Sequence, residues 1–352
     1  MENQNQTPHK RRVRYKGKYP KKFEEKYKEL QPEKYKDTIE HVIQKGNTPA
    51  GMHISIMVKE IIDFLNIQPG EIGFDATLGY GGHTKAMLKC LNGKGHIYAT
   101  DVDPEESDKT KKRLADQGFG EDLLTVKLQN FCTIDEIAKE VGGFDFILAD
   151  LGVSSMQIDN PKRGFSFKVD GPLDLRLNQE AGISAAERLD TITRDELAGM
   201  LYENSDEPYC EELAKAITDE IRKGNRIDTT TKLRQVIEKT LDFLPEKEKK
   251  DTVKKTCQRV FQALRIDVNS EFEVLEAFLN ALPEALADAG RVAILTFHSG
   301  EDRLVKKAFQ QYYREGIFEE IATDVIRPTA EECRQNGRAR STKMRWAIRA
   351  GR

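Results

Sequence analysis

The feature that most constrains this chain is a regular alternation of short apolar segments and amphipathic segments between residues 54 and 151. The apolar segment 144–151, FDFILADL, is almost continuously apolar, as a strand buried on both faces should be. Pro104 can occupy the first turn of a helix. Alternation of this kind predicts an α/β fold of Rossmann-like type, with a doubly wound, mostly parallel sheet. The predicted strands are 71–78, 95–101, 124–128 and 144–151, and the predicted helices are 54–65, 83–91, one starting at 104, and 133–141.

The pattern changes after residue 157, where helical segments follow one another without a convincing buried strand. We therefore expect a helical insertion, after which 257–286 continues as helix and 291–297 (RVAILTF) returns as a buried strand. Segments 321–326 and 344–348 could supply the closing strands. The predicted organisation is a basic N-terminal extension at 1–50, a first part of the core at 51–157, a helical inserted domain at 158–256 and a second part of the core at 257–352.

Local signals refine some of these boundaries. Thr133, with Glu136 three positions later, predicts a capping box at the start of the helix that ends near residue 141. Inside the insertion, helical spacing indicates separate helices at 185–189, 194–202, 210–223 and 230–241.

Composition excludes several classes of protein. One third of the residues are charged, the mean hydropathy is −0.62, and no apolar run approaches 18 residues, so we expect no transmembrane helix. Residues 1–19 lack the apolar core of a secretory signal. The five cysteines are scattered and include no CxxC pair, which fits neither a disulfide framework nor a zinc site. We therefore expect a cytoplasmic protein.

The net charge of −3 conceals a strongly basic segment near the N-terminus. Ten lysines and arginines lie between residues 10 and 28, against only Glu24 and Glu25. A basic arm of this kind can bind phosphates without sequence preference. The alternative is a solvated tail with no partner.

Chemistry-bearing residues follow the predicted strands at their carboxyl ends, where a doubly wound sheet binds its ligand. DATLGYGGHT (75–84) supplies glycines and a helix N-terminus, and Asp101 can accept hydrogen bonds from both hydroxyls of a ribose. These features serve NAD and S-adenosylmethionine equally. The dinucleotide fingerprint GxGxxG, counted from Gly79, would need glycine where Thr84 stands. Phe131 follows the third strand, where adenine contacts are expected, although packing in the core is the alternative.

Beyond these features, the sequence resembles a known family, the bacterial 16S ribosomal RNA cytosine N4-methyltransferases. The similarity runs from about residue 53 to residue 349. Several of the matching stretches are long and unusual, so the resemblance is specific. They are DATLGYGGHT (75–84), DLGVSSMQID (150–159), RGFSFKVDGPLDLRL (163–177), RVFQALRIDVNSE (259–271), FHSGEDR (297–303) and RARSTKMRWA (338–347).

The resemblance implies a class I methyltransferase fold whose inserted helical domain recognises the substrate, with S-adenosyl-L-methionine as cofactor. It implies methylation of the N4 amine of a cytosine in 16S rRNA of the small ribosomal subunit, expected at position 1402 in the decoding region. No membrane partner is expected, and a homodimer is possible. The residues that match the family's cofactor contacts are Gly81, Gly82, His83, Asp101, Phe131, Asp150 and Gln157.

Some positions depart from the family's usual pattern. Tyr80 stands where the family usually has arginine, Met156 where it has proline and Gly300 where it has leucine. The family's Gly-Glu-Glu element is Ser205-Asp206-Glu207 here, and the basic extension is not part of the usual pattern. These departures leave open a methyltransferase with a different RNA target.

Asp150 is the predicted catalytic residue, because a carboxylate after an apolar strand is well placed to accept hydrogen bonds from a reacting amine. Its alternative role is to hold the cofactor only. A target base must leave its stack to be modified and can then stack on aromatic rings. Phe165 and Phe167 are the candidates for that contact, with Arg163 and Lys168 for phosphate, and packing of the insertion is the alternative.

Three further residues are predicted to face the substrate. Arg265 shares a helix with core residues and is expected at the cleft, while His298 and Arg303 follow the fifth strand at the ligand end of the sheet. Only one histidine is present there, so we expect no metal. The competing functions are a non-catalytic RNA-binding ribosome-assembly factor, a small-molecule methyltransferase and an NAD enzyme.

Overall fold

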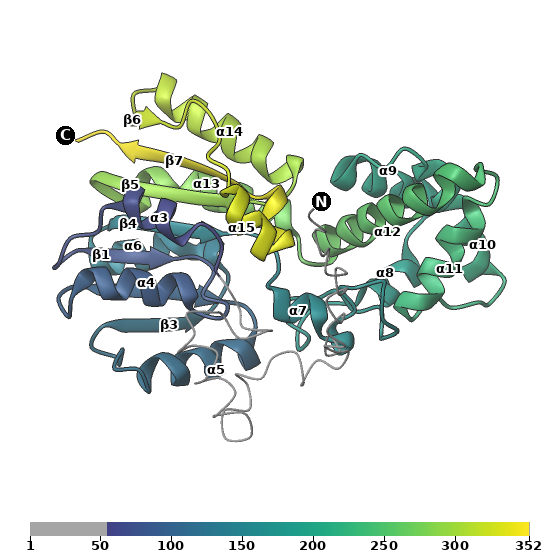
Figure 1. The fold of residues 1–352 in the computed structure, drawn as a ribbon, viewed down its shortest axis with the longest axis horizontal. Helices are drawn as coiled ribbons and strands as arrows, with labels where there is room; N and C mark the ends of the chain where they lie inside the picture. Colours follow the sequence, from purple (N-terminus) through teal and green to yellow (C-terminus); the bar gives the residue numbers. More distant parts are fainter. Residues whose placement is uncertain (1–54, 352) are drawn as a thin grey trace, which may run out of the picture. The chain divides into compact units, whose positions relative to one another are not determined.

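The computed structural model describes residues 55–351, and these residues contain a sheet of seven strands flanked by helices (Figure 1). The strand order is β3-β2-β1-β4-β5-β7-β6. Strands β1 to β5 are parallel, and β7 runs antiparallel to both β5 and β6. The predicted mostly parallel α/β fold is confirmed. The strands are β1 (Ile72–Asp75), β2 (His96–Asp101), β3 (Leu124–Leu128), β4 (Phe144–Asp150), β5 (Leu286–Thr296), β6 (Phe318–Ile321) and β7 (Lys343–Arg349).

Helices bury both faces of the sheet, and β4 shows why this strand is apolar throughout. Ile147 packs into a cluster with residues of α6, α13 and α14, while its neighbours Phe146 and Leu148 pack into a cluster with residues of α3 and α4. All three side chains are fully buried. The helices of the core are α3 (Val58–Leu65), α4 (Gly82–Leu91), α5 (Pro104–Ala115), α6 (Ile134–Val141), α13 (Glu271–Ala285), α14 (Ser299–Arg314) and α15 (Ala330–Gln335).

The segment between β4 and α13 is helical and has an apolar cluster of its own, separate from the two clusters that cover the sheet. Short 3-10 turns occur at η2 (Phe131–Thr133), η3 (Pro161–Arg163) and η4 (Gly337–Ser341). Figure 1 shows α9 to α12 gathered together away from the sheet. The helices of this segment are α7 (Ser155–Asp159), α8 (Ala185–Thr191), α9 (Arg194–Ser205), α10 (Cys210–Arg222), α11 (Thr230–Thr240) and α12 (Glu246–Val268).

The helical prediction for 257–286 is confirmed, but the segment is not continuous. The chain forms α12 and α13 there, separated at Asn269 and Ser270, and Ser270 adopts a left-handed conformation with φ 48°. The side chain of Asn269 donates to the Leu175 carbonyl and accepts from the Leu177 amide, both at 2.8 Å. These long-range bonds stabilise the break, and no local signal announces them. Helix α12 is continuous across the predicted domain boundary at 256/257.

Two smaller expectations also differ from the structure. Thr133 makes no side-chain capping bond to α6; its hydroxyl instead donates to the Asn130 carbonyl at 2.8 Å, and the Asn130 side chain caps the preceding 3-10 turn. The predicted strand 344–348 is confirmed within β7, but the predicted strand 321–326 is shifted, because β6 ends at Ile321 and Ile326 forms only an isolated bridge with Met344. The basic extension lies outside the described residues.

Close packing between β1 and β4 yields a first prediction. A β-carbon added at Gly73 would lie 2.0 Å from the Phe146 ring, whereas one added at Gly199, in α9, would meet nothing within 4 Å. Gly73→Ala should therefore lower the free energy of unfolding by about 1–3 kcal/mol through overpacking. Gly199→Ala, the matched control, should raise it by about 0.4–1 kcal/mol. Urea denaturation measures both, and equal stability of the two variants would contradict the packing described here.

Candidate active site at the carboxyl edge of the sheet

Three aspartates end neighbouring strands at one edge of the sheet: Asp75 on β1, Asp101 on β2 and Asp150 on β4. Strand β1 lies between β2 and β4, so the direction of winding reverses there, and this is where ligands bind in such sheets. Asp75 is fully buried, and its oxygens accept from the Thr84 hydroxyl at 2.6 Å and the Thr77 amide at 3.0 Å. Asp75 therefore organises the turn that follows β1.

The turn after β1 contains Gly79, Gly81 and Gly82, and its backbone conformation and close packing explain why glycine stands there. Gly79 and Gly81 have φ 47° and 79°. A β-carbon at Gly81 would lie 2.7 Å from Thr110 of α5, and one at Gly82 would lie 1.9 Å from the Ser55 hydroxyl. Gly81 is the N-cap of α4 and offers no side-chain cap, which leaves the first amides of α4 available to a ligand.

Tyr80, the departure from the family's usual arginine, lies within this turn. The guanidinium of Arg113, on α5, lies over the Tyr80 ring at 3.7 Å and donates to the Tyr80 carbonyl at 2.7 Å. A guanidinium is thus held beside the glycine turn by α5.

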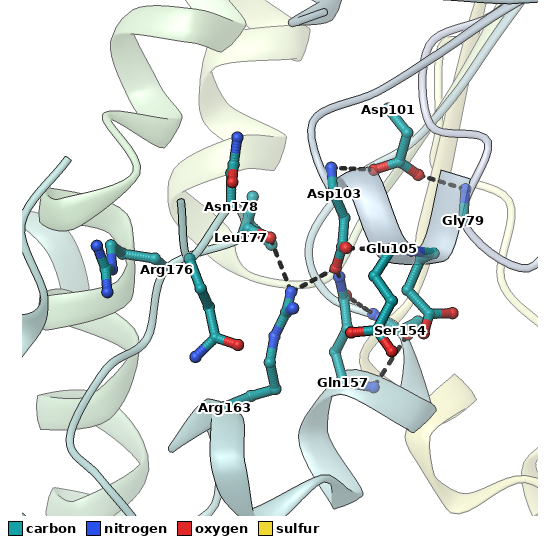
Figure 2. A network of polar contacts seen from close by, with 12 residues as sticks. Gly79, Asp101, Asp103, Glu105, Ser154, Gln157, Arg163, Arg176, Leu177 and Asn178 are labelled. Carbon is teal, nitrogen blue, oxygen red and sulfur yellow. Dashed lines mark hydrogen bonds and ion pairs between the residues drawn. The ribbon is translucent and has the colours of Figure 1, made fainter. Parts of the chain in front are cut away.

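Asp101 is held in place by two backbone amides (Figure 2). One carboxylate oxygen accepts from Gly79 at 2.8 Å and the other from Asp103 at 2.9 Å. Burial raises the pKa of Asp101 to about 6, against which these hydrogen bonds act. Each oxygen retains a further lone pair, so the predicted role of Asp101 as acceptor for ribose hydroxyls is compatible with its surroundings.

Asp103 is a central residue that the sequence analysis missed. It is almost completely buried, and one oxygen accepts from the Glu106 amide at 3.2 Å as the N-cap of α5. The other accepts from Arg163 at 2.5 Å and from Gln157 at 3.3 Å (Figure 2). The signal available in the sequence was an aspartate directly before the helix-starting Pro104.

Gln157 and Arg163 both direct side-chain donors to Asp103. Gln157 also closes a capping box with Ser154 at the start of α7. Arg163 is 6% exposed and donates a further hydrogen bond to the Leu177 carbonyl at 2.7 Å. Contrary to the prediction, Arg163 is therefore not available to an RNA phosphate; it links the beginning of the helical segment to the N-cap of α5.

The predicted stacking residues also lie in packed surroundings. Phe165 is buried in the apolar cluster of the helical segment. The Phe167 ring packs edge-on against Phe261, with ring centroids 5.7 Å apart, and Phe131 packs edge-on against Phe278 at 5.2 Å. For Phe165 and Phe167 these contacts favour the packing alternative. Phe131 remains partly exposed, so one side of its ring can still meet a ligand.

Asp150 differs from the other carboxylates in having an unused oxygen. Its amide donates to the Thr77 hydroxyl at 2.8 Å, which fixes the end of β4. Among the described residues, its buried Oδ1 has no hydrogen-bond partner, and Oδ2 lies 3.4 Å from Nδ1 of His83. Burial raises the pKa of Asp150 to about 6; His83 acts in the opposite direction, while Asp75 and Glu301 raise the pKa further. This is the carboxylate best prepared to accept a donor from a substrate.

A second charged cluster joins α12, α13 and α14. Arg265 donates to both oxygens of Glu271, at 2.7 and 2.9 Å. His298 Nε2 lies 3.2 Å from Glu301, whose other oxygen accepts from the Phe297 amide. Although burial favours the neutral acid, His298 and Arg265 hold the pKa of Glu301 below its usual value.

This cluster bears on the remaining predicted residues. Glu271, His298 and Glu301 could each offer one atom to a metal ion, with all three atoms within 4.8 Å of one another. The guanidinium of Arg265 already neutralises Glu271, so we assign the cluster to ion pairing. Arg265 and His298 therefore serve this network, whereas Arg303 is exposed on α14 and remains available to a substrate.

The sheet reverses its direction of winding at β1, a glycine turn follows that strand, and Asp101 can accept from ribose hydroxyls. These features define an α/β enzyme that binds a nucleoside-containing cofactor. Residues 50–350 match the model of the MraW methylase family, and the chain belongs to this family. It is a methyltransferase that uses S-adenosylmethionine, as expected. The NAD enzyme considered from the sequence is thereby excluded.

Several relatives support membership of this family. A protein of Agathobacter rectalis named ribosomal RNA small subunit methyltransferase H 1 is 81% identical over 342 residues, covering 97% of this chain and 98% of that protein. A Lachnoclostridium phytofermentans protein of the same name is 69% identical and covers 99% of this chain and 95% of its own length. A protein of Acidobacterium capsulatum named ribosomal RNA small subunit methyltransferase H is 35% identical over 84% of this chain and 97% of its own length.

The first of these matches is long enough to include most of the basic extension. The extension is therefore shared with at least this relative. Among the helices that the structure describes, none combines the length and the apolar character needed to cross a membrane.

The buried pair between Arg163 and Asp103 yields a second prediction. Arg163→Ala would leave the Asp103 carboxylate buried without its cation, and should lower the free energy of unfolding by about 3–5 kcal/mol. The matched control is Arg226→Ala, which breaks an exposed 2.8 Å pair with Asp190 and should cost less than about 1 kcal/mol. Urea denaturation distinguishes them, and a similarly small cost for both variants would show that the buried pair does not hold the helical segment in place.

Proposed function

We propose that this protein transfers the methyl group of S-adenosylmethionine to the N4 amine of a cytosine in 16S rRNA, in the cytoplasm. The expected nucleotide is position 1402, and the expected substrate is the small ribosomal subunit, for which the relatives are named. The observation that carries the proposal is Oδ1 of Asp150, a buried acceptor without a partner in the described chain, at the carboxyl end of β4. A cytosine amine is a donor that would satisfy it.

The residues beside Asp150 fit the cofactor. Asp101 can accept from the ribose hydroxyls, the first amides of α4 at Gly82 and His83 can bind a carboxylate, and Phe131 can lie against the adenine. When bound, the cofactor supplies an electrophilic methyl group on a sulfonium, which needs no activation by the protein.

The chain must therefore act on the nucleophile. The exocyclic amine of cytosine is a weak nucleophile because its lone pair is delocalised into the ring. Asp150 would orient the amine through a hydrogen bond to Oδ1 and accept its proton as the new bond forms. Orientation and general-base catalysis of this kind typically contribute about 10²–10⁴-fold in rate.

The helical segment supports an RNA substrate. A cavity of about 790 Å³ lies between α11 and α12, and its lining includes four exposed lysines. Within residues 55–351 none of the four forms an ion pair. The same lining also carries Glu238, Asp242, Glu246 and Asp251, and the first three of these pair with Arg234 or Lys249. The lining therefore keeps an excess of positive charge that can attract phosphates. Arg303 on α14 is a further exposed cation. The four exposed lysines in the lining of the cavity are Lys168, Lys239, Lys250 and Lys254. The predicted possibility of a homodimer stays a prediction.

The proposed function is tested by incubating the protein with 30S subunits and labelled S-adenosylmethionine, then mapping the product by mass spectrometry. We expect one methyl group on N4 of a decoding-region cytosine. Methylation of another nucleotide would establish a different RNA target. Cofactor binding without any transfer to RNA would favour the non-catalytic assembly factor.

Asp150→Asn tests the catalytic assignment. Asparagine keeps the size of the side chain but can present a donor to the amine's own hydrogens, so single-turnover methyl transfer at saturating cofactor should fall by about 10²–10⁴-fold. The control is Asp145→Asn, in the same strand, where an amide oxygen can still accept from the Ile72 amide as the carboxylate does at 2.8 Å. Near wild-type turnover of Asp150→Asn would leave Asp150 as a cofactor ligand only.

A further inference from the structure

The protonation of His83 is constrained by a backbone carbonyl. His83 lies in the first turn of α4, and the residue is 7% exposed. Nε2 lies 2.8 Å from the carbonyl oxygen of Ile56. A carbonyl can only accept, so Nε2 must carry the hydrogen. In a neutral imidazole the other nitrogen, Nδ1, then presents a lone pair.

That lone pair faces a carboxylate. Nδ1 lies 3.4 Å from Oδ2 of Asp150, and an ionised carboxylate has only acceptors. In the absence of a proton, two acceptors therefore oppose each other in a buried site. A proton on either atom converts this contact into an attraction. Oδ1, the other oxygen of Asp150, remains free for the substrate.

The charges around Asp150 favour uptake of this proton. Asp75 on β1 and Glu301 on α14 both act on Asp150 with negative charge and favour a proton on the pair, whereas His83 on α4 stabilises the Asp150 carboxylate only when it carries that proton itself. The oxygens of Asp75 are occupied by Thr84 and Thr77, and Glu301 is held by Phe297. Neither acid is positioned to take the proton instead of Asp150.

We propose that His83 and Asp150 act as one proton-accepting pair, which is empty before methyl transfer and holds the proton released by the amine afterwards. This inference rests on the proposed function. As the nitrogen–methyl bond forms and the sulfur–methyl bond breaks, the amine's proton passes to the Asp150 carboxyl. Rotation of the carboxyl group brings the proton to Nδ1 of His83, and solvent later removes it. His83 is a positioning residue, because it contacts Asp150 rather than the reacting atoms.

The pair has a definite pH dependence. It must be empty to accept a proton, so activity should be present at high pH and lost as the pH falls through the titration of the pair. Burial raises the pKa of Asp150, so we expect the acid limb to lie above the ordinary range of a carboxyl group.

His83→Gln tests the pair through its pH–rate profile. A glutamine amide can still donate to the Ile56 carbonyl but places no acceptor nitrogen opposite Asp150. Single-turnover transfer at pH 8 and saturating cofactor should fall at least tenfold, the acid limb should move to lower pH, and cofactor affinity should change less than threefold. The control is His96→Gln on β2, whose ring contacts the Asp122 carbonyl and Thr125 hydroxyl, and this variant should keep the wild-type profile.

Two results would overturn the proposal. If the acid limb of the His83→Gln profile stays in place and the rate remains within twofold of wild type, His83 has only a packing role. A limb moved to higher pH would show that His83 acts as a resident cation that keeps Asp150 ionised.

Nitrogen NMR of the unmodified protein, labelled with ¹⁵N-histidine, tests the pair without RNA and without relying on a variant's activity. At pH 8, His83 should be the neutral tautomer with hydrogen on Nε2, and Nδ1 should become protonated or hydrogen-bonded as the pH falls through the acid limb. The His83→Gln spectrum assigns the signal. Hydrogen on Nδ1 of a neutral ring, or an imidazolium at pH 8, would overturn the pair. Failure of 30S methylation with these NMR results intact would instead reject the proposed function alone.

Discussion

Buried carboxylates at the carboxyl edge of the sheet must be matched by donors, because each charge removed from water without partners costs several kcal/mol. This constraint determines the local structure of the active site. Asp75 is satisfied by the turn that follows it, Asp101 by the amides of Gly79 and Asp103, and Asp103 by α5, Gln157 and Arg163. Among these four carboxylates, only Asp150 has a buried oxygen without a hydrogen-bond partner. The turns, the start of α5 and the entry to the helical segment are thus fixed by the same requirement.

At Tyr80 and Gly300, neighbouring side chains compensate for the departure from the family's usual residue. Tyr80 supports the guanidinium of Arg113 in place of an arginine of its own. At Gly300, where the family usually has leucine, an added β-carbon would lie 2.7 Å from the Phe272 ring, so Phe272 occupies that space. Glu207, in the altered Gly-Glu-Glu element, remains fully buried and accepts from the Tyr209 amide. These changes preserve local packing around an unchanged set of carboxylates.

The sheet could be predicted because its determinants are local. Apolar runs such as 144–151 and the glycine turn can each be identified from a few consecutive residues. The strand-end aspartates follow from the same pattern. The orientation of Arg163 could not, because it depends on Asp103, sixty positions away. The packing of Phe165 and Phe167 could not be predicted for the same reason, since residue type does not say which side of a loop faces the solvent. The break between α12 and α13 likewise depends on contacts of Asn269 with residues more than ninety positions earlier.

Helix α12 has 23 residues and is therefore about 35 Å long, and it ends at Asn269. In a helix of this length, a small tilt at one end moves the other end appreciably. A tilt of about five degrees at Asn269 would displace the N-terminal end by about 3 Å. The far end borders the cavity that carries the four exposed lysines. One asparagine, bonded to Leu175 and Leu177, thus fixes the C-terminal end of this helix, and the placement of Lys250 and Lys254 near its other end depends on that distant contact.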